Sequence, residues 1–98
     1  MPLRHIVSWR LAAGPVRARL AAEIRERLLT LPSQVPEIRS YEVGVDDEAA
    51  ADGFDVVLVA EFDDRQALAR YAAHPAHQAV AEFIRSAAEA RSAVNYRV

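Results

Sequence analysis

The segment Phe54–Phe62 limits the possible folds more than any other part of this 98-residue chain. Its centre, Val56–Ala60, is a continuous apolar run, which is typical of a strand whose two faces are both covered. Residues 3–11 alternate in hydropathy and predict a second strand, in which Ile6 makes the otherwise polar face partly apolar. The chain must therefore build a β-sheet that is covered on both sides.

The remaining periodicities supply helices for one side of that sheet. Apolar residues recur at helical spacing over residues 16–31 and again on both sides of His74-Pro75, where the proline separates two helices. Asp63 is expected to cap the first helix of that pair, with Gln66 three residues on. The expected elements are strands at 3–11, 37–45, 54–62 and 92–98 and helices at 16–31, 65–73 and 75–90, with an acidic connection at 46–53.

This order of elements, βαββαβ, predicts an α+β fold: a ferredoxin-like protomer with a four-stranded antiparallel sheet. Residues 1–98 are enough for one such domain. The helices of one protomer can cover only one face of the sheet. The apolar side chains expected on the other face are Ile6, Val43, Val57 and Val59. We therefore expect a homodimer in which two such faces pack together.

Composition excludes several classes of function. The chain has no cysteine, hence no disulfide or thiol nucleophile, and no lysine, hence no amine for a Schiff base. The net charge is −2 and the arginines are scattered among acids, so there is no basic face for nucleic acid. No apolar run approaches the roughly 18 residues that cross a bilayer, and residues 1–5 do not begin a signal peptide. We expect a cytoplasmic protein with no membrane partner.

Candidate chemistry gathers in the stretch Tyr71–Gln78, which holds two of the three histidines. His77 lies in the first turn of the helix that Pro75 opens, where the helix dipole keeps the imidazole pKa at or below about 6.5. A neutral imidazole can act as a general base on a proton next to a carbonyl. Tyr71 could donate a hydrogen bond to the enolate oxygen that develops, and His5, on the helix-facing side of its strand, could orient the ligand.

Other roles fit the same residues. In a structural interpretation, His77 bonds a backbone carbonyl, Tyr71 packs in the core, and the protein is a non-enzymatic dimer. In a metal interpretation, His5, His74 and His77 form a zinc site, but no carboxylate stands at a convincing ligand spacing. We expect no metal and no cofactor. The apolar walls of a ligand pocket are expected to be Leu20, Ile24, Leu58, Val80 and Ile84.

Four segments carry a family resemblance that spans nearly the whole chain. They are Arg4–Val7, Leu31–Ile38, Gly53–Asp55 and Tyr71–Gln78. In this order they resemble the stress-response A/B barrel (Dabb) family. The resemblance implies a ferredoxin-like protomer whose sheet pairs with that of a second copy to form a dimeric α/β barrel. It implies a small apolar or aromatic ligand between sheet and helices.

One plant member of this family is a cofactor-free polyketide cyclase, which implies an activity for the candidate residues. Its catalytic tyrosine and histidine match Tyr71 and His77, and the histidine of its N-terminal strand matches His5. Val56 and Ala88 stand where that enzyme has a histidine and a tryptophan, which implies a less polar pocket of different shape. The resemblance thus implies a cofactor-independent cyclase or isomerase with His77 as the base.

A further alternative also comes from the resemblance. Related dimeric α/β barrels include cofactor-free monooxygenases that use aromatic side chains of the pocket. Trp9 and Tyr96 are compatible with that activity. The sequence therefore leaves three classes open: a cyclase or isomerase, a monooxygenase, and a non-enzymatic dimer.

Overall fold

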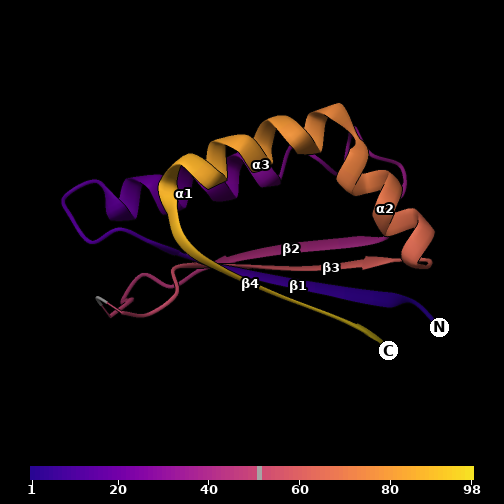
Figure 1. Cartoon of the computed structure of the whole chain (residues 1–98), viewed down its shortest axis with the longest axis horizontal. Coiled ribbons are helices and arrows are strands. Elements are labelled where there is room, and N and C mark those ends of the chain that lie inside the picture. Colours follow the sequence, from indigo (N-terminus) through magenta and orange to yellow (C-terminus); the bar gives the residue numbers. More distant parts are fainter. Residues whose placement is uncertain (51) are drawn as a thin grey trace.

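The computed structural model describes residues 1–50 and 52–98 and has the expected order of elements. The strands are β1 (Leu3–Leu11), β2 (Ser40–Val45), β3 (Val56–Phe62) and β4 (Ala88–Arg97), and the helices are α1 (Arg17–Leu28), α2 (Arg65–Ala73) and α3 (Pro75–Ala87). All three helices lie on one side of the sheet and leave the other side bare (Figure 1). Among the described residues, no helix is long and apolar enough to span a bilayer.

The sheet is antiparallel throughout, with strand order β2-β3-β1-β4. In the central strand β1, every second residue from Leu3 to Leu11 is buried, as the alternation predicted. In β3, Leu58 is buried under the helices, whereas Val57 and Val59 are half-buried on the bare face. The prediction of a ferredoxin-like α+β fold with a four-stranded antiparallel sheet is confirmed.

One residue expected on the bare face lies on the opposite face. Val43 pairs directly with Leu58, and residues directly opposite in a sheet share a face. Val43 is accordingly buried, with 6% of its surface exposed, so its assignment to the bare face was wrong. The reason is that β2 alternates, and the face that carries Glu42 is the more polar one and turns away from the core. Val94 of β4, which is 58% exposed, adds to the apolar part of the bare face.

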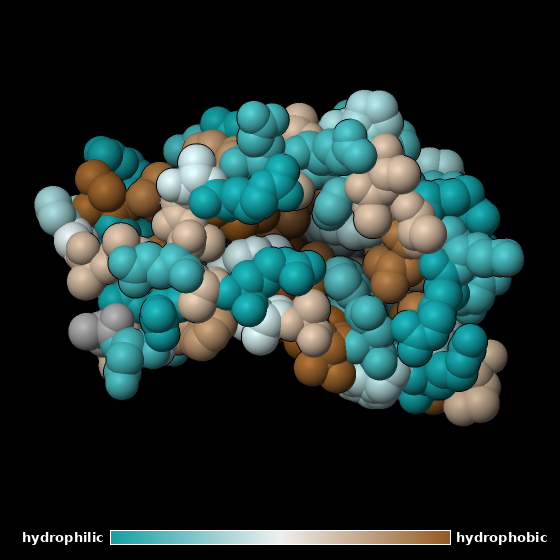
Figure 2. Space-filling view, viewed as in Figure 1, coloured by the Kyte–Doolittle hydropathy of each residue, from teal (hydrophilic) through white to brown (hydrophobic). Residues whose placement is uncertain are grey.

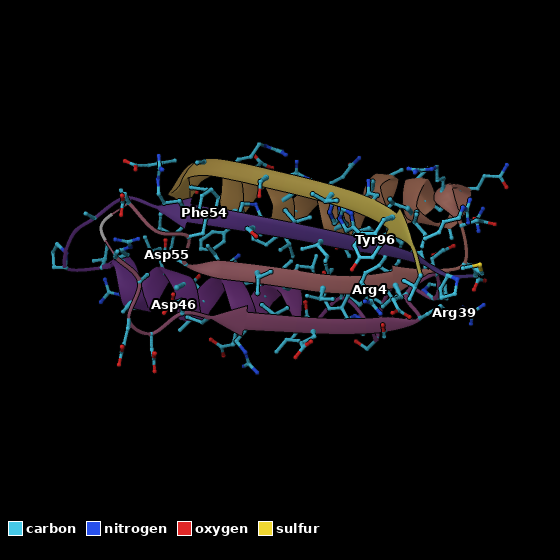
Figure 3. All side chains as sticks on the ribbon, turned by 90° about the horizontal axis from the view of Figure 1, so that it is seen from below. Arg4, Arg39, Asp46, Phe54, Asp55 and Tyr96 are labelled. Atoms are coloured by element: carbon cyan, nitrogen blue, oxygen red, sulfur yellow. The ribbon has the colours of Figure 1, made fainter. Side chains whose placement is uncertain are left out.

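Polar side chains border this apolar centre. Arg4 pairs with Glu61 at 2.7 Å, and its guanidinium lies 3.4 Å from the hydroxyl of Tyr96. Figure 3 looks onto the bare face and shows Arg4 and Tyr96 toward one end of the sheet, with Phe54 toward the other. The bare face therefore has an apolar centre bordered by hydrogen-bonded polar side chains.

The end of α3 differs from the sequence prediction. The helix was expected to continue to residue 90, but it stops at Ala87, and β4 begins at Ala88 without a connecting loop. Ala88 pairs with Leu11, so hydrogen bonding to β1 takes precedence over the helical preference of the alanines. As a result, residues 88–91 belong to the sheet.

The cap of α2 also differs by one residue. Asp64, and not Asp63, is the N-cap, and its Oδ1 accepts from the backbone N–H of Ala67 at 2.8 Å. Asp63 instead pairs with Arg39 at 2.6 Å. Either aspartate could cap a helix by type, and the ion pair with Arg39 selects between them.

A largely buried ion pair fixes the end of the sheet away from the chain termini. Arg17 donates to both carboxylate oxygens of Asp55, and one of these oxygens also accepts from the backbone N–H of Leu11 at 2.9 Å. Burial alone would raise the pKa of Asp55, but the bonds from Arg17 and Leu11 outweigh it and lower that pKa. Arg17 also donates to the carbonyl of Gly53, in the connection 46–53, of which residue 51 lies outside the described part.

Candidate functional site

A cavity of about 410 Å³ lies between the helix-facing side of the sheet and helices α1 and α3. Its apolar wall consists of Val7, Trp9, Leu28, Leu58, Val80 and Ile84. The charged and aromatic polar residues in its lining are His5, Tyr71, His77, Arg85, Glu89 and Arg91. Figure 2 shows apolar side chains recessed between the helix layer and the strand layer. The volume falls within the roughly 300–1,000 Å³ of small-molecule sites.

The expected wall is only partly right. Leu58, Val80 and Ile84 line the cavity, whereas Leu20 and Ile24 do not. Ile24 is fully buried in the core, and α1 contributes Leu28, one turn further along, to the wall. Helical periodicity identified the apolar stripe of α1 but not which turn of it lies over the cavity.

His77 is held by the geometry of the α2–α3 turn. His74 precedes Pro75 in an extended conformation, and its Nδ1 accepts from the backbone N–H of Ala76 at 3.0 Å. The helix therefore starts at Pro75 and places His77 in its first turn. The Nδ1 atom of His77 lies 3.1 Å from the carbonyl oxygen of Ala72.

That contact defines the tautomer of His77. A carbonyl oxygen can only accept, so Nδ1 carries the proton and, in the neutral ring, Nε2 carries the lone pair. Burial is the main cause that lowers the pKa of His77; the bond to Ala72 opposes it, and the guanidiniums of Arg91 and Arg85 act in the same direction as burial. The predicted direction is thus right, and its main cause is burial. At neutral pH the ring is an uncharged imidazole.

Tyr71 forms the centre of the polar cluster. Its side chain is 1% exposed, its ring centroid lies 4.4 Å from that of His77, and its hydroxyl oxygen lies 2.7 Å from that of Tyr41. Burial raises the pKa of Tyr71 to about 12, so the phenol stays protonated. Its ring also lies 6.3 Å from that of His5. Tyr71 therefore contacts both histidines of the cavity.

His5 belongs to a row of residues that crosses the sheet. The register places Tyr41, Ala60, His5 and Asn95 side by side on β2, β3, β1 and β4. The small Ala60 leaves space between Tyr41 and His5, above which Tyr71 packs. His5 Nδ1 lies 2.6 Å from Oδ1 of Asn95, and burial is the main cause of the lowered pKa of His5.

The structure thus brings His5, Tyr71 and His77 to one cavity and excludes His74 from it. His74 does not line the cavity, because its ring caps α3. Within residues 1–50 and 52–98, no three histidine, aspartate or glutamate side chains gather closely enough to hold a metal ion. His5, His74 and His77 therefore do not converge on one point in this structure.

Sequence reasoning missed four residues of the site. Tyr41 and Asn95 bind Tyr71 and His5, and Arg85 and Arg91 line the mouth of the cavity. Arg91 was assigned to the region after a helix because the end of α3 was placed too late. A period of two from Ala88 onward was the available signal for strand structure at Arg91.

A family model for the stress responsive A/B barrel domain matches residues 3–98. The chain belongs to the Dabb family. Two solved structures are similar over almost the whole Dabb domain. A dimeric ferredoxin-like protein of unknown function from Thermobifida fusca is 29% identical, with a TM-score of 0.83 and coverage of 100% of this chain and 92% of that one. A dimeric protein of unknown function from Bacteroides fragilis is 28% identical, with a TM-score of 0.88 and coverage of 99% and 96%.

The fold also occurs in an enzyme. The hydroxynitrile lyase from Passiflora edulis is 23% identical to this chain, with a TM-score of 0.82. The match covers 99% of this chain and 93% of the lyase. At this identity the likeness shows a shared fold. No curated protein sequence matches the chain.

Proposed function

We propose that this Dabb protein binds a small apolar or aromatic molecule in the cavity and acts on it as a cofactor-independent cyclase or isomerase. His77 is the general base, Tyr71 donates a hydrogen bond to the enolate oxygen, and His5 orients the ligand. The observation that carries the proposal is the bond from His77 Nδ1 to the Ala72 carbonyl, because it fixes the ring and leaves Nε2 as the proton acceptor.

The proposed step begins with transfer of a proton from the carbon next to a carbonyl to Nε2 of His77. The C–H electron pair moves into the new double bond, and the carbonyl oxygen becomes an enolate oxygen, which Tyr71 stabilises. In a cyclase, the enolate carbon attacks a second carbonyl of the same molecule, and the resulting alkoxide takes the proton from His77. In an isomerase, the proton returns to a different carbon. His77 ends neutral in both cases.

Tyr41 has a positioning role in this scheme. One of the two hydroxyls must donate to the other, and only if Tyr41 donates does Tyr71 keep its own proton for the ligand. Burial is also the largest cause of the raised pKa of Tyr41, so both phenols remain neutral and able to donate.

The lyase of the same fold supports the proposal that this protein is an enzyme. The Passiflora protein shows that this scaffold can hold an enzyme site for a small molecule, a hydroxynitrile in that case. The cavity here has the volume for such a ligand and is walled by apolar residues. The present proposal differs in its reaction, which starts from a carbonyl compound.

The test is exchange of the α-protons of acetophenone with D₂O, followed by NMR. Wild-type protein is expected to accelerate exchange, His77→Ala to abolish that acceleration with little change in thermal stability, and Gln78→Ala, in the same turn, to behave like the wild type. Absence of acceleration by the wild-type protein would contradict a base at this position.

A second candidate is a non-enzymatic dimer in which the histidines only pack. Among the described residues, no buried side-chain nitrogen or oxygen lacks a hydrogen-bond partner, which is the pattern of a satisfied core. In that case His77→Ala lowers the melting temperature, and neither binding nor proton exchange is observed with the wild type.

We also infer a homodimer formed through the bare face. Ile6 lies opposite Val59 on one side and Val94 on the other, and Ser8 lies opposite Val57, so the apolar residues form one patch across three strands. A second copy with the same patch would cover it. The Thermobifida and Bacteroides structures above, both ferredoxin-like, are dimeric, which supports this assembly.

A further inference from the structure

The mouth of the cavity carries two arginines that the proposed chemistry leaves unused. Residues on both sides of the junction between α3 and β4 line the cavity. Arg85 comes from the last turn of α3, and Arg91 comes from β4. Arg85 also lines a second, more open groove along α3, so it lies where the cavity meets solvent.

Neither guanidinium has a partner in the part of the chain that the structure describes: no ion pair or hydrogen bond involves Arg85 or Arg91. Arg17 and Arg39, in contrast, each bind a carboxylate of the chain through two or more bonds. An arginine is always charged and its planar head matches a carboxylate, so an unpaired pair of them at a cavity mouth suits an anion.

The single carboxylate among the described lining residues does not neutralise this charge. Glu89 lines the cavity, but its Oε2 also lies 3.9 Å from Nε of Arg10. Since both histidines are neutral, the charged groups at the mouth are the guanidiniums of Arg85 and Arg91 and the carboxylate of Glu89. That carboxylate also interacts with the guanidinium of Arg10, so the mouth keeps a net positive charge. The charge also reaches inward, because Arg91 adds to the effect of burial in lowering the pKa of His5 and of His77.

We infer that the ligand is an aromatic or apolar carboxylate, with its carboxylate on Arg85 and Arg91 and its body against Trp9, Leu58 and Ile84. This inference rests on the proposed function, since it concerns the same cavity. The mouth binds the charged end and the apolar wall receives the rest, which points the ligand body inward toward His77 and Tyr71.

The experiment compares three carboxylates, benzoate, 2-naphthoate and octanoate, each with its neutral amide, by isothermal titration calorimetry. At least one carboxylate is expected to bind about tenfold or more tightly than its amide, as one charge-assisted contact predicts. Arg85→Gln and Arg91→Gln are each expected to weaken carboxylate binding about tenfold and leave amide binding unchanged. Arg97→Gln is the control, because Arg97 is an exposed arginine of β4 outside the cavity lining.

The outcomes separate this inference from the proposed function. Equal affinity for acids and amides, or a carboxylate affinity that survives both arginine variants, overturns the anion preference and leaves the apolar pocket standing. The inference is also overturned if no carboxylate binds with a dissociation constant below about 10 mM. If no amide binds either, the proposal of a ligand pocket is contradicted as well.

Discussion

The hydroxyl oxygens of Tyr41 and Tyr71 lie 2.7 Å apart and join strand β2 to helix α2 above the polar row of the sheet. Tyr71 is almost fully buried, so its hydroxyl has lost most of its access to water. The bond therefore links the sheet to the helix layer at the site. It also decides which hydroxyl proton is available to a ligand.

Replacing one tyrosine of this pair should destabilise the protein, because the other hydroxyl loses its partner. Tyr41→Phe or Tyr71→Phe alone should lower the free energy of unfolding by about 1–2 kcal/mol, and the double variant should lose less than the sum of the two. Urea denaturation of all four proteins measures this coupling. Additive losses would show that the two hydroxyls do not interact.

The ion pair between Arg17 and Asp55 should matter far more than an exposed one. Their side chains are 13% and 4% exposed, so Arg17→Ala leaves a buried carboxylate uncompensated and should cost about 3 kcal/mol in the free energy of unfolding. Arg39→Ala, which breaks a pair exposed by 59% on each side, should cost less than about 1 kcal/mol. Urea denaturation compares the two. Equal costs would contradict the burial argument.

Stability should fall in mildly acidic solution because of the cavity histidines. Burial lowers the pKa of His5 and His77, so below about pH 6.5 the unfolded chain binds more protons than the folded one. The free energy of unfolding should thus be constant above about pH 7 and decrease as the pH drops from about 6.5 through the folded pKa values.

Melting temperatures measured from pH 8 to pH 5 test this dependence. His77→Gln should reduce the loss of stability on acidification, whereas Gln78→Ala should reproduce the wild-type profile. Asp55, whose pKa is lowered by Arg17 and Leu11 against the effect of burial, contributes in a separate window below about pH 4. A flat profile between pH 7 and 5 would show that these rings are not buried in the folded state.

A charge on the bare face should dissociate the dimer. Val59→Asp places a carboxylate in the middle of the apolar patch, opposite Ile6, and is expected to yield monomers or unfolded protein. Val16→Asp, at a valine that is 42% exposed just before α1, is the control. Analytical ultracentrifugation distinguishes the states. A stable dimer of Val59→Asp would exclude this face as the interface.

Most of the fold could be predicted from local patterns. The alternation of β1 and the proline at position 75 are short-range signals, and both matched the structure. The apolar alternation of β2 also placed Val43 with Tyr41 on one face, and that face turned toward the helices. The error at Val43 came from grouping it by hydropathy with Val57 and not by the period of two.

The rest depends on contacts between distant parts of the chain. No local feature shows that Asp63 will pair with Arg39, or that Ala88 will hydrogen bond to β1 and stop α3. For the same reason the histidines could be named in advance, but their partners Ala72 and Asn95 could not. The residue type of His77 suggests acid–base chemistry. Which of its ring nitrogens carries the proton depends on the Ala72 carbonyl that it contacts in the folded chain.

The continuity of α3 and β4 gives the cavity no separate lid. To move the backbone of Arg85 away from that of Arg91, the chain must unwind the last helical turn or break the first hydrogen bonds between β4 and β1, beside the register shift at Arg10 and Leu11. Both movements are local unfolding at the edge of the sheet. The backbone spacing between the two arginines at the mouth is therefore set by the stability of this edge of the sheet.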